Sequence, residues 1–280
     1  MTDILLTGLA IGESPRWHDG RLWFGNWGTQ EIVAVDAEGK SAVMAHVPTA
    51  FAFCFDWLPD GRLIVVSGPE GLLLRQEPDG SFVTHADLGP LASTGWNDIV
   101  VDGRGNVYVN NIVFDFTKGE PPAPGFVAVL TPDGELRRVG EGLMLPNGMA
   151  VTPDGLTLIV AESFAPRLKA WDIEADGSLS NGRVWAELEF GSDGICVDAD
   201  GAVWSPAQQG CVRVREGGEV VERVELDRFC FACMLGGEDG RTLFMMAADW
   251  RGPESMTDGS RTGQVVTHAT AVAGAGWPAR

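Results

Sequence analysis

The chain has 280 residues, of which 45% are hydrophobic and 21% are charged, and its formal net charge is −19. This composition is typical of a folded globular protein and excludes a chain that is disordered throughout. A surface this acidic repels phosphate backbones and anionic membranes, so we expect neither nucleic acid nor a membrane as a partner.

The first predicted element is a short apolar strand at Ile4–Leu6. The segment Met1–Ala10 contains Asp3 and no basic residue, unlike a secretory signal. No later run reaches the roughly 18 apolar residues of a membrane-spanning helix, so we expect a cytoplasmic protein. An exposed apolar edge invites aggregation, and the strand is therefore predicted to pair with the last repeat of the chain.

Six copies of one unit follow. Each contains Asp-Gly or a close variant and then an alternating apolar strand, and the turn glycines recur every 39 to 50 residues, at Gly20, Gly61, Gly105, Gly155, Gly201 and Gly240. Asp-Gly between apolar runs favours a hairpin, because glycine accepts the positive φ of the turn. Further turns between these copies lie at 36–39, 77–80, 131–134, 174–177 and 216–218.

Two hairpins in each repeat make a four-stranded antiparallel blade, and a repeat of this length is typical of propellers. We therefore predict an all-β chain that forms a single six-bladed β-propeller domain over residues 1–280. The N-terminal strand is predicted to close the last blade. No stretch has the pattern of a long amphipathic helix.

The innermost strand of each blade precedes the first turn and should line the central channel. Seven residues before the turn glycine in blade one, and eight in the others, the sequence has Glu13, Phe53, Asn97, Asn147, Asp193 and Ala232. Two converging carboxylates in apolar surroundings are costly unless a cation neutralises them. Four oxygen ligands suit Ca²⁺ or Mg²⁺ and can accept Mn²⁺, Zn²⁺ or Fe²⁺, and no histidine or cysteine falls in this ring.

Each of the four polar residues also has a simpler explanation. Asn147-Gly148 and Asp193-Gly194 are common turn dipeptides, Glu13 can cap a loop, and Asn97 can satisfy backbone groups. The shared register favours a metal ring, because independent turn residues have no reason to fall at one distance from the next turn. Asp98 follows Asn97 in a strand and is expected to point away from the channel.

These residues also carry a resemblance to a known family. The segments 12–17, 97–98, 146–149 and 192–198 resemble motifs of the senescence marker protein / gluconolactonase / luciferin-regenerating enzyme family, over about residues 12–274. The resemblance implies a six-bladed propeller with one divalent ion in its channel, for which Ca²⁺ is the favoured candidate. It implies Glu13, Asn147 and Asp193 as metal ligands, and Asn97 as a ligand or a substrate contact.

The predicted activity is hydrolysis of a sugar lactone or another small-molecule lactone, in which the ion polarises the carbonyl group and Asp193 is the general base. The residues leave open whether the metal or Asp193 activates the water. The alternatives are a phosphotriester hydrolase with the same metal, a non-catalytic propeller that binds a metal and a partner, and a strictosidine synthase-like propeller. A serine triad has no supporting motif in the sequence.

The predicted substrate contacts are Asn97, Trp96, Phe53, Asn110 and Phe114. The irregular stretch 110–124 is a candidate specificity loop over the metal, and 248–251 is another candidate wall.

Several lactonases of the resembling family have an arginine two residues before the asparagine, where this chain has Gly95. That departure argues against a gluconolactone-type substrate, and Trp96 favours a more apolar pocket or different hydroxyl contacts. The expected partner is a small-molecule substrate, and the expected state is a monomer or a small homo-oligomer.

The five cysteines have irregular spacing, which argues against a disulfide framework. Cys230 and Cys233 form one C-x-x-C motif, but no second pair of ligands lies near it in the sequence. Packed thiols in a sheet are therefore the favoured interpretation.

Overall fold

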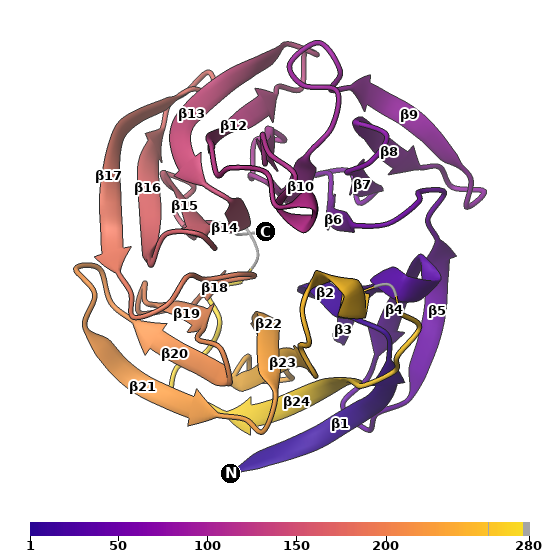
Figure 1. Ribbon diagram of the computed structural model, residues 1–280, viewed down its shortest axis with the longest axis vertical. Coiled ribbons are helices and arrows are strands. Elements are labelled where there is room, and N and C mark those ends of the chain that lie inside the picture. Colours follow the sequence, from indigo (N-terminus) through magenta and orange to yellow (C-terminus); the bar gives the residue numbers. More distant parts are fainter. Residues whose placement is uncertain (257, 277–280) are drawn as a thin grey trace.

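The computed structural model describes residues 1–256 and 258–276. These residues form six four-stranded sheets, arranged as blades around a central axis (Figure 1). The predicted all-β six-bladed propeller is therefore confirmed. The predicted domain range, 1–280, also includes Thr257 and residues 277–280, which lie outside the described residues.

The blades follow one another along the chain, each from its inner strand outwards. Blade one contains β2 (Gly12–His18), β3 (Arg21–Asn26), β4 (Glu31–Val35) and β5 (Ser41–His46). Blade two contains β6 (Phe53–Trp57), β7 (Leu63–Ser67), β8 (Leu72–Gln76) and β9 (Phe82–Asp87). Blade three contains β10 (Trp96–Val101), β11 (Val107–Asn111), β12 (Pro124–Leu130) and β13 (Leu136–Met144).

The second half of the ring has the same organisation. Blade four contains β14 (Pro146–Val151), β15 (Thr157–Glu162), β16 (Arg167–Ile173) and β17 (Leu179–Glu187). Blade five contains β18 (Cys196–Val197), β19 (Val203–Pro206), β20 (Gly210–Val214) and β21 (Val220–Glu225). Blade six contains β22 (Phe229–Gly236), β23 (Thr242–Ala248), β24 (Gly263–Ala269) and β1 (Thr2–Leu9).

The Asp-Gly turns join the two inner strands of each blade, as the repeat predicts. In blade two, Gly61 has φ +85°, and its N–H donates to the carbonyl oxygen of Leu58 at 2.8 Å. A side chain at Gly61 would meet no atom, so the positive φ alone explains the glycine. The second turn series joins the two outer strands, for example β8 and β9 around residues 77–80.

The N-terminal strand closes the ring. β1 pairs antiparallel with β24, in a register that runs from Thr2 opposite His268 to Leu9 opposite Gly263. Figure 1 shows the N-terminus at the outer edge of the molecule, beside β24. The last blade thus takes its outer strand from the start of the chain, which confirms the predicted closure and covers an otherwise open sheet edge.

Apolar side chains from alternate strand positions pack between neighbouring blades. At the junction of blades one and six, the Trp17 ring stacks on Phe244 with ring centroids 5.4 Å apart. Such interfaces bury nearly every apolar residue of the inner three strands. The inner strands are thereby packed around the channel, which is where the predicted site residues lie.

The helices in the described residues are short 3₁₀ turns, namely η1 (Trp27–Thr29), η2 (Phe116–Lys118) and η3 (Pro253–Met256). None of the helices found there is long and apolar enough to cross a membrane. Two of the turns, η2 and η3, belong to long loops that contribute to the cavities described next.

Candidate active site

Three inner strands have a β-bulge beside the predicted ligands. The shifts in pairing fall between Glu13 and Arg16 in β2, between Trp96 and Ile99 in β10, and between Pro146 and Met149 in β14. A bulge adds one residue to a strand and redirects its side chains. Glu13, Asn97 and Asn147 all lie in these shifted segments, which explains how residues from three blades reach one cavity.

Asp193 lies outside the regular strands and is held by blade six. The next residue, Gly194, forms an isolated parallel bridge with Ala232, and a Cβ on Gly194 would lie 2.5 Å from the Cβ of Ala232. A Cβ on Gly148 would likewise lie 2.5 Å from the carbonyl oxygen of Asp193. The glycines after Asn147 and Asp193 therefore permit close approach of backbones near the axis, rather than forming turns.

The four predicted ligands line one chamber of about 260 Å³, the inner chamber. A second cavity of about 10 Å³ is lined by Glu13, Asn97 and Asn147, and its size corresponds to roughly one water molecule or ion. The structure thus brings Glu13, Asn97, Asn147 and Asp193 together in the lining of a single chamber.

Hydrogen bonds orient the two amides. The Asn97 Nδ2 group donates to the carbonyl oxygen of Pro146 at 3.2 Å, and the Asn147 Nδ2 group donates to Ser163 Oγ at 3.1 Å. With each nitrogen anchored in this way, the amide oxygens are left to serve as acceptors or metal ligands. Glu13 Oε2 accepts from the N–H of Ser14 at 3.0 Å.

Backbone strain accompanies this arrangement. Ser14, next to Glu13, has φ +52°, and Leu145, two residues before Asn147, has φ +53°. Non-glycine residues rarely adopt a positive φ, and strained backbone of this kind concentrates at functional sites. Packing of the surrounding blades maintains both conformations beside the candidate ligands.

Burial and neighbouring negative charges disfavour ionisation of the two carboxyl groups in the chamber, Glu13 and Asp193. Burial, and then the negative charge of Asp193, raise the pKa of Glu13 well above its usual value. Burial and the charge of Asp98 raise the pKa of Asp193 to about 8, against the lowering effect of the Gly194 N–H and the Asn147 amide. Each carboxyl would return to its ionised form beside a cation.

This donor set fits a hard divalent ion. Among residues 1–256 and 258–276, no group of three or more histidine, cysteine, aspartate or glutamate side chains is arranged to hold a metal. An ion in this chamber therefore requires the amide oxygens of Asn97 and Asn147 as well as the carboxylates of Glu13 and Asp193. An all-oxygen set of this kind suits Ca²⁺.

A buried charge network lies at the floor of the site. Arg16 Nη2 donates to the carbonyl oxygen of Ile99 at 2.8 Å, and the guanidinium lies 3.7 Å from Asp56 and 3.8 Å from Asp98. Asp98 accepts from the N–H of Met149 at 2.8 Å, which links blades three and four. Asp98 lines the small cavity, so the expectation that it points away was wrong, because the bulge directs it inwards.

In two blades, counting back from the turn glycine does not give the residue that lines the small cavity. β6 pairs with β7 without a shift, so Cys54, rather than Phe53, lines the small cavity. In β22 the shift falls between Cys230 and Ala232, and Cys233 lines that cavity in place of Ala232. Two thiols therefore line the small cavity, although the ring of counted positions contains no cysteine.

The predicted substrate contacts divide into two groups. Trp96, Phe114 and Asn97 line an outer chamber of about 420 Å³. Phe53 is fully buried in the core between blades one and two, and Asn110 is fully buried beneath the site. Asn110 donates to the carbonyl oxygen of Asn147 at 2.6 Å and accepts from the N–H of Asp98, so it supports two bulges rather than contacting a ligand.

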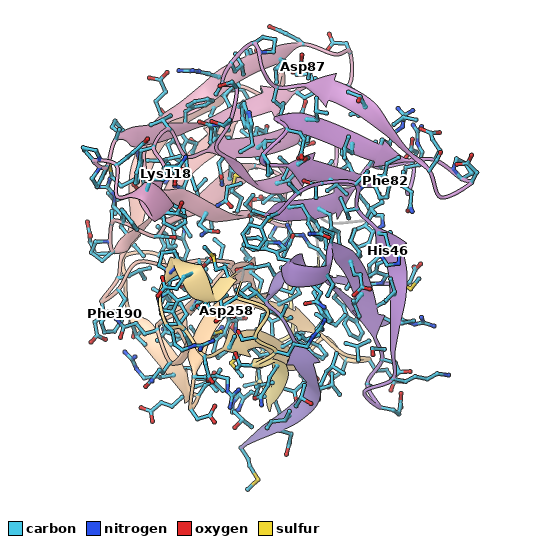
Figure 2. The ribbon with its side chains drawn as sticks, turned by 45° about the vertical axis from the view of Figure 1, so that its right-hand side comes forward. His46, Phe82, Asp87, Lys118, Phe190 and Asp258 are labelled. Atoms are coloured by element: carbon cyan, nitrogen blue, oxygen red, sulfur yellow. The ribbon has the colours of Figure 1, made fainter. Side chains whose placement is uncertain are left out.

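Most of the chamber walls were not predicted. The inner chamber is bounded by large apolar side chains, namely Trp27, Phe116, Phe164, Phe229, Phe231, Trp250 and Met256. The loop containing η2 and the segment containing η3 contribute to both chambers, and Lys118 and Asp258 mark these two segments in Figure 2. The candidate loop 110–124 and the candidate wall 248–251 therefore both border the site.

The C-x-x-C motif lies beside cysteines that are distant from it in the sequence. Cys211 Sγ lies 3.5 Å from Cys230 Sγ, and side-chain contacts also join Cys233 to Cys196 and Cys211. Burial raises the pKa of Cys196, Cys211 and Cys233 well above the usual thiol value, so these groups are neutral. The expectation of packed thiols in a sheet agrees with this cluster, although a second pair does lie nearby in space.

The backbone explains why Gly95 cannot be an arginine here. Gly95 has φ +83°, and its carbonyl oxygen accepts from the N–H of Ile112 at 2.7 Å. A Cβ on Gly95 would lie 2.0 Å from the carbonyl oxygen of Ile112. Any side chain at this position collides with the backbone of the loop that follows β11.

We expect Gly95→Ala to lower the free energy of unfolding by about 3 kcal/mol or more, because the collision adds to the cost of a positive φ. Gly61→Ala is the matched control, since Gly61 has φ +85° with no atom nearby, and should cost about 1–2 kcal/mol. Urea denaturation of both variants measures the difference. Equal losses would show that the close approach to Ile112 is not present in solution.

The fold and the site together define a class of protein, a six-bladed propeller in which two carboxyl and two amide side chains line one chamber. Residues 11–249 match the family model described as SMP-30/Gluconolactonase/LRE-like region, and the chain belongs to this family. The resemblance noted in the sequence is thereby confirmed.

Named relatives span much of the chain. It is 26% identical to pentonolactonase XacC of Haloferax volcanii over 280 residues, covering 94% of this chain and 90% of that protein. It is 30% identical to diisopropyl-fluorophosphatase of Loligo vulgaris over 154 residues, covering 50% of this chain and 49% of that protein. The fold also matches the structure of a calcium-binding protein, regucalcin, of Agrobacterium tumefaciens, with TM-score 0.76, 20% identity and coverage of 98% and 94%.

Proposed function

We propose that this protein is a divalent-metal-dependent hydrolase of a lactone. The observation that carries the proposal is the convergence of Glu13, Asn97, Asn147 and Asp193 on one chamber, where both carboxyl groups are buried and their pKa values are raised. Membership of a family that includes gluconolactonases supports this reaction class, as does the similarity to a pentonolactonase along most of the chain.

The proposed ion is Ca²⁺, with Mn²⁺, Zn²⁺ and Fe²⁺ as alternatives that the oxygen ligands can accept. A fold shared with a protein described as calcium-binding supports this choice. When bound, the ion supplies the positive charge that polarises the ester carbonyl and stabilises the oxyanion. Glu13, Asn97, Asn147 and Asp193 would hold it. Asn147 is itself oriented by Ser163.

Asp193 is the proposed general base. Its carboxylate would take a proton from the attacking water as the carbon–oxygen bond forms, and would return that proton to the alkoxide oxygen as the lactone ring opens. The amide of Asn147 and the N–H of Gly194 bond to Asp193 and keep the carboxylate in place. The apolar walls keep bulk water away from the reacting ester.

A phosphotriester hydrolase is the second candidate. The apolar lining of the chamber suits neutral organophosphates, and the matching half of the chain is 30% identical to a diisopropyl-fluorophosphatase. The same ligand set would then face a phosphoryl oxygen in place of a carbonyl oxygen. The third reading, a propeller that binds a metal and a partner without catalysis, has no observation in its favour.

We expect metal-stripped protein to lose lactone hydrolysis by about 10²-fold or more, and one of Ca²⁺, Mn²⁺, Zn²⁺ or Fe²⁺ to restore it. The measurement is initial rate on a panel of sugar and aliphatic lactones, with an organophosphate triester as comparison. An unchanged rate in the chelated protein would contradict a metal-dependent mechanism. Folded, metal-loaded protein that hydrolyses only the organophosphate would favour the second candidate, and inactivity on both would favour the non-catalytic reading.

A further inference from the structure

The inner chamber offers few hydrogen bonds beyond the candidate ligands. Its hydroxyl groups are Ser163 and Ser192, and both are engaged. Ser163 Oγ donates to the carbonyl oxygen of Ser192 at 2.9 Å and accepts from Asn147, while Ser192 Oγ lies 2.6 Å from Ser205 Oγ. None of the described lining residues of this chamber is a lysine, an arginine or a histidine.

A polyhydroxylated ligand would therefore leave its own hydroxyl groups unpaired. Each buried hydroxyl that exchanges water for an apolar wall incurs a desolvation cost. Gly95 lines the neighbouring outer chamber, and the backbone of Ile112 excludes any side chain there. Beyond the four candidate ligands, the described lining of the inner chamber therefore offers few side-chain groups that could bind sugar hydroxyls.

Two groups of aromatic rings border the chamber instead. In the first, Phe164 lies 5.6 Å from Phe114 and 6.3 Å from Phe116, measured between ring centroids. Phe164 is 50% exposed although it is a large apolar residue. Because Phe164 also lines the inner chamber, its exposed ring is available to a ligand there.

The second aromatic group comes from blade six. Trp250 lies 5.7 Å from Phe231 and 6.2 Å from Phe229, and the tryptophan is 38% exposed. The two groups belong to different blades, yet both contribute side chains to the same inner chamber. A planar apolar group in that chamber would have aromatic contacts from both.

The inner and outer chambers are also joined through common walls. Trp27, Asn97, Ile112, Phe116 and Met256 line both of them. The outer chamber, of about 420 Å³, adds Phe51 and Trp96 as apolar walls and Asp115, Lys118 and Glu120 as charged ones, of which Lys118 and Asp115 form an ion pair at 2.8 Å. Space for an apolar group therefore continues outwards from the carboxylates.

We propose that the substrate is a lactone with an aromatic or similarly broad apolar substituent. This substituent occupies the inner chamber beside the two aromatic groups, while the ester lies at Glu13 and Asp193. This inference rests on the proposed lactonase function and narrows it to a substrate class. Sugar lactones are then poor substrates. Phe164 is a specificity-determining residue, because its ring contacts both aromatic residues of the loop that contains η2.

The test compares δ-valerolactones with phenyl or methyl on the carbon that carries the ring oxygen, together with glucono-δ-lactone. The phenyl and methyl compounds share a secondary-alcohol leaving group, and each enzymatic rate is divided by the rate of hydroxide-catalysed hydrolysis. We expect kcat/KM for the phenyl compound to exceed the methyl value by about tenfold to 100-fold, from the additional apolar area buried. Phe164→Ala should reduce this ratio by about tenfold.

Leu156→Ala is the matched control, because Leu156 is 54% exposed in the same blade and does not line either chamber. It should retain the wild-type ratio. Equal values for phenyl and methyl, or faster hydrolysis of glucono-δ-lactone than of the phenyl compound, would overturn the substrate class and leave the lactonase proposal standing. No metal-dependent hydrolysis of any of the three would overturn both.

Discussion

Asp193→Asn is expected to lower kcat for lactone hydrolysis by about 10²–10⁴-fold, the usual contribution of a positioned general base. Asparagine preserves the shape and one oxygen of the side chain, but it cannot take a proton from water at neutral pH. The substitution also removes one negative charge from the candidate metal ligands. The rate should therefore be measured at saturating metal, so that weaker metal binding is separated from loss of the base.

The control for this variant is Asp227→Asn, because Asp227 is an exposed aspartate that pairs only with the neighbouring Arg228 among the contacts of the described residues. It removes the same charge at a distance from the chamber and should retain wild-type kcat. Circular dichroism establishes that both variants are folded. If Asp193→Asn kept more than about a tenth of the wild-type kcat at saturating metal, the base would have to be sought elsewhere.

The free energy of unfolding of the metal-free protein is expected to fall as pH rises. In the metal-free protein the pKa of Asp193 and of the buried Asp56 is raised from 3.8 to about 8, chiefly by burial, and that of Glu13 is raised as well. Between about pH 4 and pH 8 the folded chain then binds more protons than the unfolded chain. The contribution of these groups to stability is present at acidic pH and is lost towards pH 8.

A bound divalent ion reverses this trend, because it favours the ionised carboxylates and must displace their protons. At 100 times its Kd, the ion should add about 2.7 kcal/mol to the free energy of unfolding, which corresponds to about 5–10 °C in Tm. The gain should be larger at pH 8 than at pH 5.5. Thermal denaturation with chelator or with added Ca²⁺ at both pH values measures it, with potassium chloride at equal ionic strength as control.

Glu13→Gln provides a second check on the same site. This variant removes one of the two carboxylates, so its Ca²⁺-dependent gain in Tm at pH 8 should be smaller than that of the wild type. The metal-free variant should also lose less stability between pH 5.5 and pH 8. A full Ca²⁺ response in Glu13→Gln would place the ion away from this chamber.

The architecture could be predicted from the sequence because its signals are local. A turn glycine such as Gly61 and the alternation of the strand after it lie within a few residues of one another. Repetition of that pattern along the chain predicted both the number of blades and the closing role of the N-terminal strand. The same repetition brought Glu13, Asn97, Asn147 and Asp193 to attention as one group, and the structure places them in one chamber.

The tertiary structure decided what each position faces. Counting a constant number of residues back from the turn glycine assigned Phe53 to the channel. The regular pairing of β6 instead places Cys54 at the small cavity. In β10, by contrast, the bulge turns Asp98 towards that cavity. These bulges are supported by contacts between blades, such as the bond from Asn110 in blade three to the carbonyl oxygen of Asn147 in blade four.

The apolar walls and the thiol cluster likewise unite residues from distant parts of the chain. Phe164 and Trp250 border one chamber, and Cys211 meets Cys230, only because the ring is closed. By itself, the sequence determined the repeat and the polar residues it carries, because hairpin turns and strand alternation arise from neighbouring residues. The lining of the chamber was decided by packing between blades, which depends on side chains that are far apart in the sequence.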